Sequence, residues 1–207
     1  MTRPLGVILA GGQAERMGGG DKALLPLGDG TLLDHVVARL SPQVSGLVLN
    51  ANGQPARFSD TGLPVVADSV TDAGAGFAGP LAGVLAGMDH AAATGADHIV
   101  TAAADTPFFP VDLVVRLSAV LTPERPIAMA ATPDPKRGLA RHPTFALWPV
   151  WLRELLRAAL KGGTRKVVAF SDPLGTASAA FPDEAAFFNV NRPEDLVRAS
   201  EMLEARR

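Results

Sequence analysis

One arginine and one lysine stand among glycines near the start of this chain, a combination that suits the binding of an anion. The segment VILAGGQAERMGGGDK runs from Val7 to Lys22, and its apolar opening indicates a buried strand. Glycines after a strand let the backbone approach a ligand closely, while Arg16 and Lys22 add positive charge. We therefore interpret the segment as a polyphosphate site, against the alternative of a surface loop with two solvated cations.

Two common glycine-rich patterns do not describe this segment. A Walker A loop has lysine directly after glycine and then serine or threonine, but here Asp21 precedes the lysine and Ala23 follows it. The residues Gly18, Gly20 and Ala23 have the spacing of a dinucleotide fingerprint, but they begin well after Ala10, where the predicted strand ends. We therefore discount both patterns.

The elements that position these residues alternate between two kinds. Short runs of branched apolar residues alternate with segments of helical period, which is typical of an α/β protein with a mostly parallel sheet. Strands are predicted at 5–10, 46–50, 64–67, 98–103, 126–131 and 143–147, and helices around 33–40, 81–88, 110–121, 151–160 and from 193 through 203. Ligands of such sheets bind beyond the carboxyl ends of the strands, so residues just after strand ends are candidate site residues.

Composition limits the class of protein. The chain has 207 residues, 47% hydrophobic and 19% charged, and no segment that looks like a linker, so we predict a single domain over 1–207. A net charge of -2 argues against a general nucleic-acid or membrane binder, and the absence of cysteine excludes thiolate metal sites. No apolar run reaches the ~18 residues that cross a bilayer. We expect a cytoplasmic protein that binds neither nucleic acid nor membrane.

The opening segment resembles the N-terminal motif of the molybdenum cofactor guanylyltransferases. That motif reads L-A-G-G-x-x-x-R-M-G-G-x-D-K-x-L-L, and 9–25 match it at every fixed position. GPLAG at 79–83, DTP at 105–107, HPT at 142–144 and NVNRPE at 189–194 resemble further family segments in the same order. The resemblance implies a Rossmann-like nucleotidyltransferase fold with helices on both faces of the sheet.

The resemblance also implies an activity: transfer of GMP from GTP to molybdenum-molybdopterin, with release of pyrophosphate and a requirement for Mg²⁺. The N-terminal half would then bind GTP and the C-terminal half molybdopterin. GTP and molybdenum-molybdopterin are the implied partners, and proteins that carry or receive the cofactor are further candidates.

Residue by residue, the resemblance implies a GTP site and a catalytic set. Lys22 would neutralise charge on the α-phosphate, with Arg16 and Asp105 as the other catalytic residues. The residues implied to bind GTP are Leu9, Ala10, Gly11, Gly12, Arg16, Gly18, Lys22, Asn50, Asp68 and Asp105. Without the resemblance Asn50 is interpreted as a turn residue, and Asn52 leaves open which of the two asparagines contacts the nucleotide.

Asp105 is the clearest candidate for a metal ligand. It follows a predicted apolar strand, and Pro107 enforces an extended exit from that strand. Mg²⁺ prefers oxygen ligands and is usually held by one or two carboxylates together with phosphate oxygens. The structural alternative is that Asp105 caps a helix opening near residue 110.

The residues implied to bind molybdopterin are His142, Asn189 and Asn191. A histidine that opens a buried strand is more often a hydrogen-bonded structural residue, which is the alternative for His142. Asn189 and Asn191 project to one side of an extended chain, or else they cap the helix predicted from Pro193.

Other activities remain as alternatives. A cytidylyltransferase for the same cofactor has a similar motif that usually begins L-A-A-G, so Gly11, together with Gly19 and Asp21, favours guanine. A non-catalytic nucleotide-binding protein and an NAD-linked dehydrogenase are alternatives from other classes, distinguished by release of pyrophosphate and by binding of nicotinamide.

Overall fold

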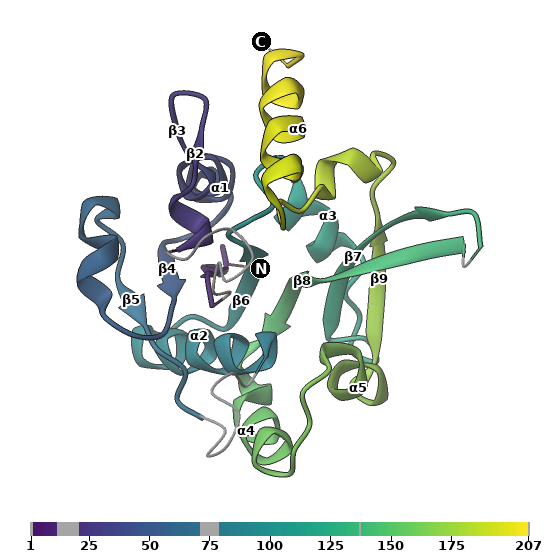
Figure 1. Cartoon of the computed structure of the whole chain (residues 1–207). Coiled ribbons are helices and arrows are strands. Elements are labelled where there is room, and N and C mark those ends of the chain that lie inside the picture. The colour runs from purple at the N-terminus through teal and green to yellow at the C-terminus, as the bar shows by residue number, and fades with distance from the viewer. Residues whose placement is uncertain (1, 12–20, 71–78, 137, 207) are drawn as a thin grey trace.

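The computed structural model of the chain describes residues 2–11, 21–70, 79–136 and 138–206, and a seven-stranded sheet forms its centre (Figure 1). The strand order is β5-β4-β1-β6-β8-β7-β9. The strands are β1 (Leu5–Leu9), β4 (Leu47–Asn50), β5 (Val65–Val66), β6 (His98–Ala103), β7 (Ile127–Asp134), β8 (Gly138–Pro149) and β9 (Thr176–Ala180). A separate two-stranded pair consists of β2 (Pro26–Leu27) and β3 (Gly30–Thr31).

Six α-helices surround the sheet within the described residues. They are α1 (Leu32–Leu40), α2 (Pro80–Thr94), α3 (Leu113–Ala119), α4 (Arg153–Lys161), α5 (Val167–Ser171) and α6 (Pro193–Glu204). Short 3₁₀ helices include η2 (Lys22–Leu24) and η4 (Pro55–Thr61), which both carry residues near the site described below. None of the helices that the structure describes is long and apolar enough to cross a bilayer.

The pairing confirms the mostly parallel sheet predicted from the sequence. β5, β4, β1 and β6 pair in parallel, as do β7 and β9, and only β8 runs antiparallel to its two neighbours. The predicted strand at 143–147 is part of the much longer β8, whose outer portion forms a hairpin with β7 (Figure 1). β9 was not predicted, because its sequence TASAA lacks branched apolar residues and its strand conformation depends on pairing with β7.

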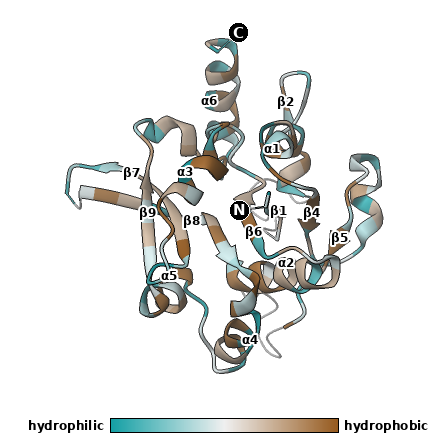
Figure 2. Ribbon diagram, turned by 180° about the vertical axis from the view of Figure 1, so that it is seen from behind, coloured by the Kyte–Doolittle hydropathy of each residue, from teal (hydrophilic) through white to brown (hydrophobic). Residues whose placement is uncertain are grey.

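Side chains of the central strands alternate between two apolar layers. Ile8 of β1 packs in one layer with Leu33 of α1 and Leu117 of α3, and all three are buried. Val7, on the opposite face of β1, packs in the other layer with residues of α2, α4 and α5 such as Leu85. Figure 2 shows hydrophobic residues in strands such as β4 and in parts of the helices. Helices therefore cover both faces of the sheet, as expected.

Helix α2 lies so close to β1 that glycine is required at the contact. A Cβ atom on Gly87 would lie 2.5 Å from Cγ2 and 2.9 Å from Cγ1 of Val7, in a fully buried part of the core. The apolar α2 thus packs its backbone directly on the strand that ends at the site.

Gly87→Ala is therefore expected to destabilise the fold by about 1–3 kcal/mol, because the added methyl group pushes α2 away from β1. Chemical denaturation measures the change in the free energy of unfolding. Gly162→Ala is the control, since a Cβ atom there meets its nearest neighbour at an ordinary 3.4 Å. Equal stability of the two variants would contradict this account of the α2 contact.

Candidate active site

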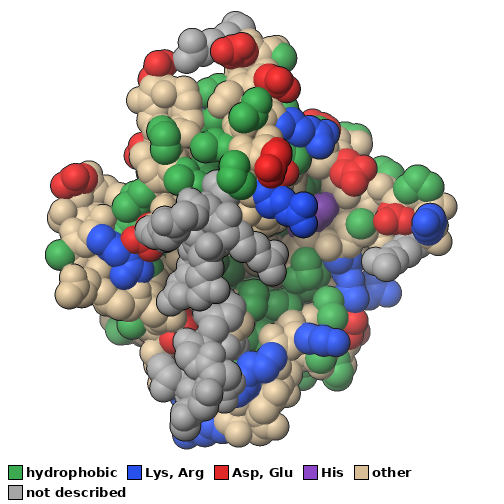
Figure 3. All heavy atoms as spheres, in the orientation of Figure 1, with side chains coloured by type: hydrophobic (Ala, Val, Ile, Leu, Met, Phe, Trp, Pro, Cys, Tyr) green, Lys and Arg blue, Asp and Glu red, His purple; other side chains and the backbone are tan. Residues whose placement is uncertain are grey.

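A pocket opens at the carboxyl ends of β1, β4 and β6. Its lining includes six of the residues predicted from the sequence, and the full lining is Leu9, Gly11, Asn50, Asp68, Gly79, Pro80, Ala103, Asp105, Thr144 and Asn189. This is the edge of the sheet where ligands of open α/β folds bind. Figure 3 shows Lys and Arg side chains interspersed with Asp and Glu over the face of the molecule in this view, in keeping with the near-neutral net charge.

Lys22, near the start of the chain, contacts residues from its middle and from its C-terminal part beside this pocket. Its Nζ lies 2.6 Å from Oδ2 of Asp105, 2.6 Å from Oδ1 of Asn191 and 3.4 Å from Oδ1 of Asn189. An ammonium group has three protons to donate, and here three oxygens accept them. Only 12% of the Lys22 side chain and 23% of the Asp105 side chain are exposed, so this ion pair is screened less than a surface pair.

One backbone and one side-chain hydrogen bond hold Asp105 just after the end of β6. The N–H of Val190 donates to the carbonyl of Asp105 at 2.9 Å, and Thr106 Oγ1 donates to its Oδ1 at 3.3 Å. The first contact also holds the segment of Asn189 and Asn191 beside the carboxylate, because Val190 is buried under α6.

Neither helix-capping alternative describes these polar residues. Helix α3 begins at Leu113 with Asp112 as its N-cap, so Asp105 does not cap it. At the start of α6, Asp195 accepts from the N–H groups of Asn191 and Arg192, while the Asn191 side chain accepts from Lys22. The side chain of Asp105 therefore lines the pocket, and that of Asn191 is directed to Lys22.

Asn50 and Asn52 both hold Asp68. Nδ2 of Asn50 donates to one carboxylate oxygen of Asp68 at 2.9 Å, and Nδ2 of Asn52 donates to the other at 2.8 Å. The N–H of Asp68 returns a hydrogen bond to Oδ1 of Asn52 at 2.9 Å. Asn50 is buried and lines the pocket, whereas Asn52 is not among the lining residues. Which of the two asparagines contacts the nucleotide stays a prediction.

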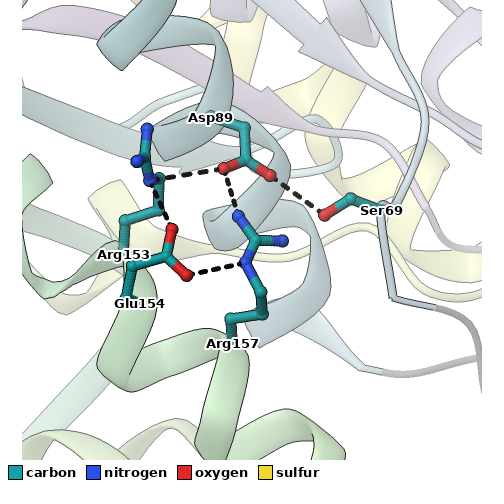
Figure 4. A network of polar contacts seen from close by, with 5 residues as sticks. All are labelled: Ser69, Asp89, Arg153, Glu154 and Arg157. Carbon is teal, nitrogen blue, oxygen red and sulfur yellow. Dashed lines mark hydrogen bonds and ion pairs between the residues drawn. The ribbon is translucent and has the colours of Figure 1, made fainter.

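A polar network holds the chain immediately after Asp68 (Figure 4). Ser69 donates to Oδ2 of Asp89 on α2 at 3.1 Å, and Arg157 of α4 contacts the other oxygen of Asp89 at 2.6 Å. Arg153 lies 3.7 Å from the same carboxylate. The network thus connects the Asp68 side of the pocket to two helices.

His142, in β8, makes structural contacts with β7 and with the 3₁₀ helix η7 (Glu184–Phe187). One ring nitrogen lies 2.9 Å from Oγ1 of Thr132, and the ring stacks on Phe187 at 4.2 Å between centroids. Burial lowers the pKa of His142, which favours the neutral ring. Thr144, two residues later in β8, lines the pocket instead, although it was not among the residues predicted from the sequence. A molybdopterin contact by His142 stays a prediction.

Of the remaining residues predicted to bind GTP, the structure describes only Ala10. Gly12, Arg16 and Gly18 lie outside the described residues. Ala10 is buried beside the pocket, and its N–H donates to the carbonyl of Asn50 at 2.9 Å. Ala10 therefore joins the ends of β1 and β4.

The residues around Lys22 fit a magnesium ion that arrives with phosphate ligands. Within the described parts of the chain, no group of three or more His, Cys, Asp or Glu side chains forms a complete metal site. The carboxylate of Asp105 and the amide oxygens of Asn189 and Asn191 already surround one cation, the Lys22 ammonium. Such oxygen donors suit Mg²⁺, which usually takes further ligands from phosphate and water.

Solved structures with the same fold include nucleotidyltransferases. The molybdopterin-guanine dinucleotide biosynthesis protein A from Archaeoglobus fulgidus has a TM-score of 0.70 and 22% identity, covering 97% of this chain and 99% of that chain. The 4-diphosphocytidyl-2C-methyl-D-erythritol synthase from Anaerococcus prevotii has a TM-score of 0.74 and 12% identity, covering 98% of this chain and 96% of that one. At these identities the likeness shows the fold alone.

Sequence relatives show the family. Residues 6–176 match the MobA-like NTP transferase domain. A molybdenum cofactor guanylyltransferase from Mesorhizobium japonicum is 47% identical over 207 residues, covering 97% of this chain and 96% of the relative. One from Cereibacter sphaeroides is 49% identical over 201 residues and covers 97% of both chains. With the matched domain over most of its length and such relatives over nearly all of it, the chain belongs to the molybdenum cofactor guanylyltransferase family.

Proposed function

We propose that the protein transfers GMP from GTP to molybdenum-molybdopterin and releases pyrophosphate. The observation that carries the proposal is the contact of Lys22 with Asp105 on one side and with Asn191 on the other, at a pocket beyond the strand ends. Family membership supports the same activity, since close relatives over nearly the full length are molybdenum cofactor guanylyltransferases.

The reaction is an in-line displacement at phosphorus. An oxygen of the terminal phosphate of molybdopterin forms a bond to the α-phosphorus of GTP, and the bond from that phosphorus to the bridging oxygen of pyrophosphate breaks. The attacking phosphate is already ionised, so no general base is required. The protein contributes positioning and neutralisation of charge, for which Lys22 is suited as a compact cation with mobile donors.

Asp105 is the residue we assign to hold magnesium. When bound, Mg²⁺ neutralises charge on the phosphate oxygens of the nucleotide. With the carboxylate of Asp105 given to the ion, Lys22 would be available to the phosphate oxygens, and Asn189 and Asn191 would remain as acceptors for its ammonium group. Arg16, which belongs to the same glycine-rich segment, is assigned to the phosphates.

The two substrates are assigned to the two halves of the single domain. The ends of β1 and β4, with Asp68, line the side of the pocket that we assign to GTP. Thr144 of β8 and Asn189 line the side assigned to molybdopterin. Proteins that carry the pterin or receive the finished cofactor are the protein partners that this activity calls for, and we propose the cytoplasm as its compartment.

GTP with Mg²⁺ is expected to raise the melting temperature more than CTP or ATP does. Binding at a concentration 100-fold above Kd adds roughly 2.7 kcal/mol to the free energy of unfolding, which a thermal shift measures readily. The same nucleotides without Mg²⁺ serve as controls. Equal shifts for CTP and GTP would remove the preference for guanine and favour the cytidylyltransferase alternative.

A further inference from the structure

Asp21, the residue before Lys22, is held by an arginine from a distant part of the chain. Nε of Arg57, in η4, lies 2.5 Å from Oδ2 of Asp21. The pair is partly buried, with 32% of the arginine side chain and 20% of the aspartate side chain exposed. Asp21 thus points to Arg57, while its neighbour Lys22 points to Asp105.

The Arg57 side chain is fixed by further contacts. Its Nη2 donates to the carbonyl of Asn52 at 2.5 Å, and its guanidinium carbon lies 4.9 Å from the centre of the Phe58 ring. A planar guanidinium offers several donors in one rigid group, so a single side chain joins the Asp21 carboxylate to the Asn52 backbone. Asn52 in turn holds Asp68.

Lys22 itself stands on a weak local element. It begins η2, which has only three residues, and the N-cap Asp21 makes no side-chain capping bond there. Two hydrogen bonds, from the N–H groups of Leu24 and Leu25 to the carbonyls of Asp21 and Lys22, define this turn. So short a 3₁₀ helix has little stability of its own. Its orientation therefore depends on anchors outside it.

We propose that Arg57 is a positioning residue of the transfer reaction: through Asp21 it orients η2 so that Lys22 reaches the reacting phosphates. The inference rests on the proposed function, and it adds a residue that does not line the pocket. Arg57 also links the Lys22 side of the pocket to Asp68 through Asn52, so one side chain aligns two walls of the nucleotide site.

The chain provides a matched control in Arg116. Its Nε lies 2.6 Å from Asp112, its Nη1 donates to the carbonyl of Ala180 at 3.4 Å, and its guanidinium lies 5.3 Å from the Phe181 ring. It therefore makes the same three kinds of contact as Arg57, but it is on α3 and does not line the pocket.

Steady-state kinetics of GMP transfer test the proposal. Arg57→Gln is expected to lower kcat roughly tenfold with a smaller change in KM for GTP, because the charge of Lys22 remains but its placement is lost. Asp21→Asn should cause a similar loss of kcat. The double variant should have a kcat no lower than that of the worse single variant, since both changes remove the same contact between Arg57 and Asp21. Arg57→Lys keeps the positive charge but lacks the planar guanidinium group with its several donors, so it should recover part of kcat. Arg116→Gln should keep the wild-type kcat.

Amide hydrogen exchange gives a readout that does not depend on activity. The N–H groups of Leu24 and Leu25 should exchange faster in Arg57→Gln and in Asp21→Asn than in the wild type, with melting temperatures like that of Arg116→Gln. Independent, additive losses in the double variant, or unchanged exchange at Leu24 and Leu25, would overturn the proposal. A wild-type protein without GMP transfer would instead overturn the proposed function and leave the exchange result to decide the role of Arg57.

Discussion

Lys22→Ala is expected to lower kcat for GMP transfer on the order of 10²-fold or more, while affinity for GTP falls less. Negative charge builds on the α-phosphate and on the departing pyrophosphate as the bond breaks, so a nearby ammonium stabilises the transition state more than bound GTP. The 12% exposure of the Lys22 side chain strengthens this effect, because little water screens the charge.

Steady-state kinetics and GTP binding, measured on the same preparations, separate the two effects. Lys161→Ala is the control, since Lys161 is an exposed lysine at the end of α4 that does not line the pocket. A rise in KM for GTP with unchanged kcat would make Lys22 a binding residue only. Melting temperatures establish that both variants are folded.

Asp105→Asn is expected to reduce GMP transfer by roughly 10²-fold or more and to weaken its dependence on Mg²⁺. The amide keeps the size of the side chain and retains an oxygen that accepts from Lys22 or Thr106, so the fold should be preserved. It loses the negative charge, and a neutral amide is a poor ligand for Mg²⁺. The loss should therefore appear in turnover across a Mg²⁺ titration and leave the melting temperature nearly unchanged.

The structure supplies a control for this substitution as well. Asp112→Asn removes the charge of an aspartate that is paired with Arg116 and stands at the N-cap position of α3, where its side chain makes no capping hydrogen bond. It should retain wild-type turnover and Mg²⁺ dependence. Near-normal turnover of Asp105→Asn at ordinary Mg²⁺ would move the metal site elsewhere, with Asp68 as the next candidate.

The sequence was sufficient for the central strands and for the location of the pocket. The predicted strands ending at Ala10, Asn50 and Ala103 correspond to β1, β4 and β6, because runs of branched apolar residues have few other favourable conformations in a buried sheet. In parallel pairing their carboxyl ends meet at one edge. Residues just after those ends, such as Asp105, were therefore predictable as neighbours of the site.

The family, too, was evident in the sequence, since the glycine-rich motif and its spacing are local features. The sequence relatives confirm the family, and the solved structures confirm the fold. The roles assigned to individual residues in binding and catalysis stay predictions, which the substitutions above address.

Only the tertiary structure decided which distant side chains meet. β9 and the length of β8 depend on pairing with β7, for which a run such as TASAA carries no periodic signal. Arg57 of η4 and Asn52 are ordinary polar residues, and no spacing in the sequence reveals that they hold Asp21 and Asp68. Lys22 and Asn191 are far apart in the sequence. They meet because the N–H of Val190 binds the carbonyl of Asp105, which brings the segment before α6 beside the residue that Lys22 contacts. Local sequence sets backbone preference and burial, whereas such contacts arise from packing among all the elements at once.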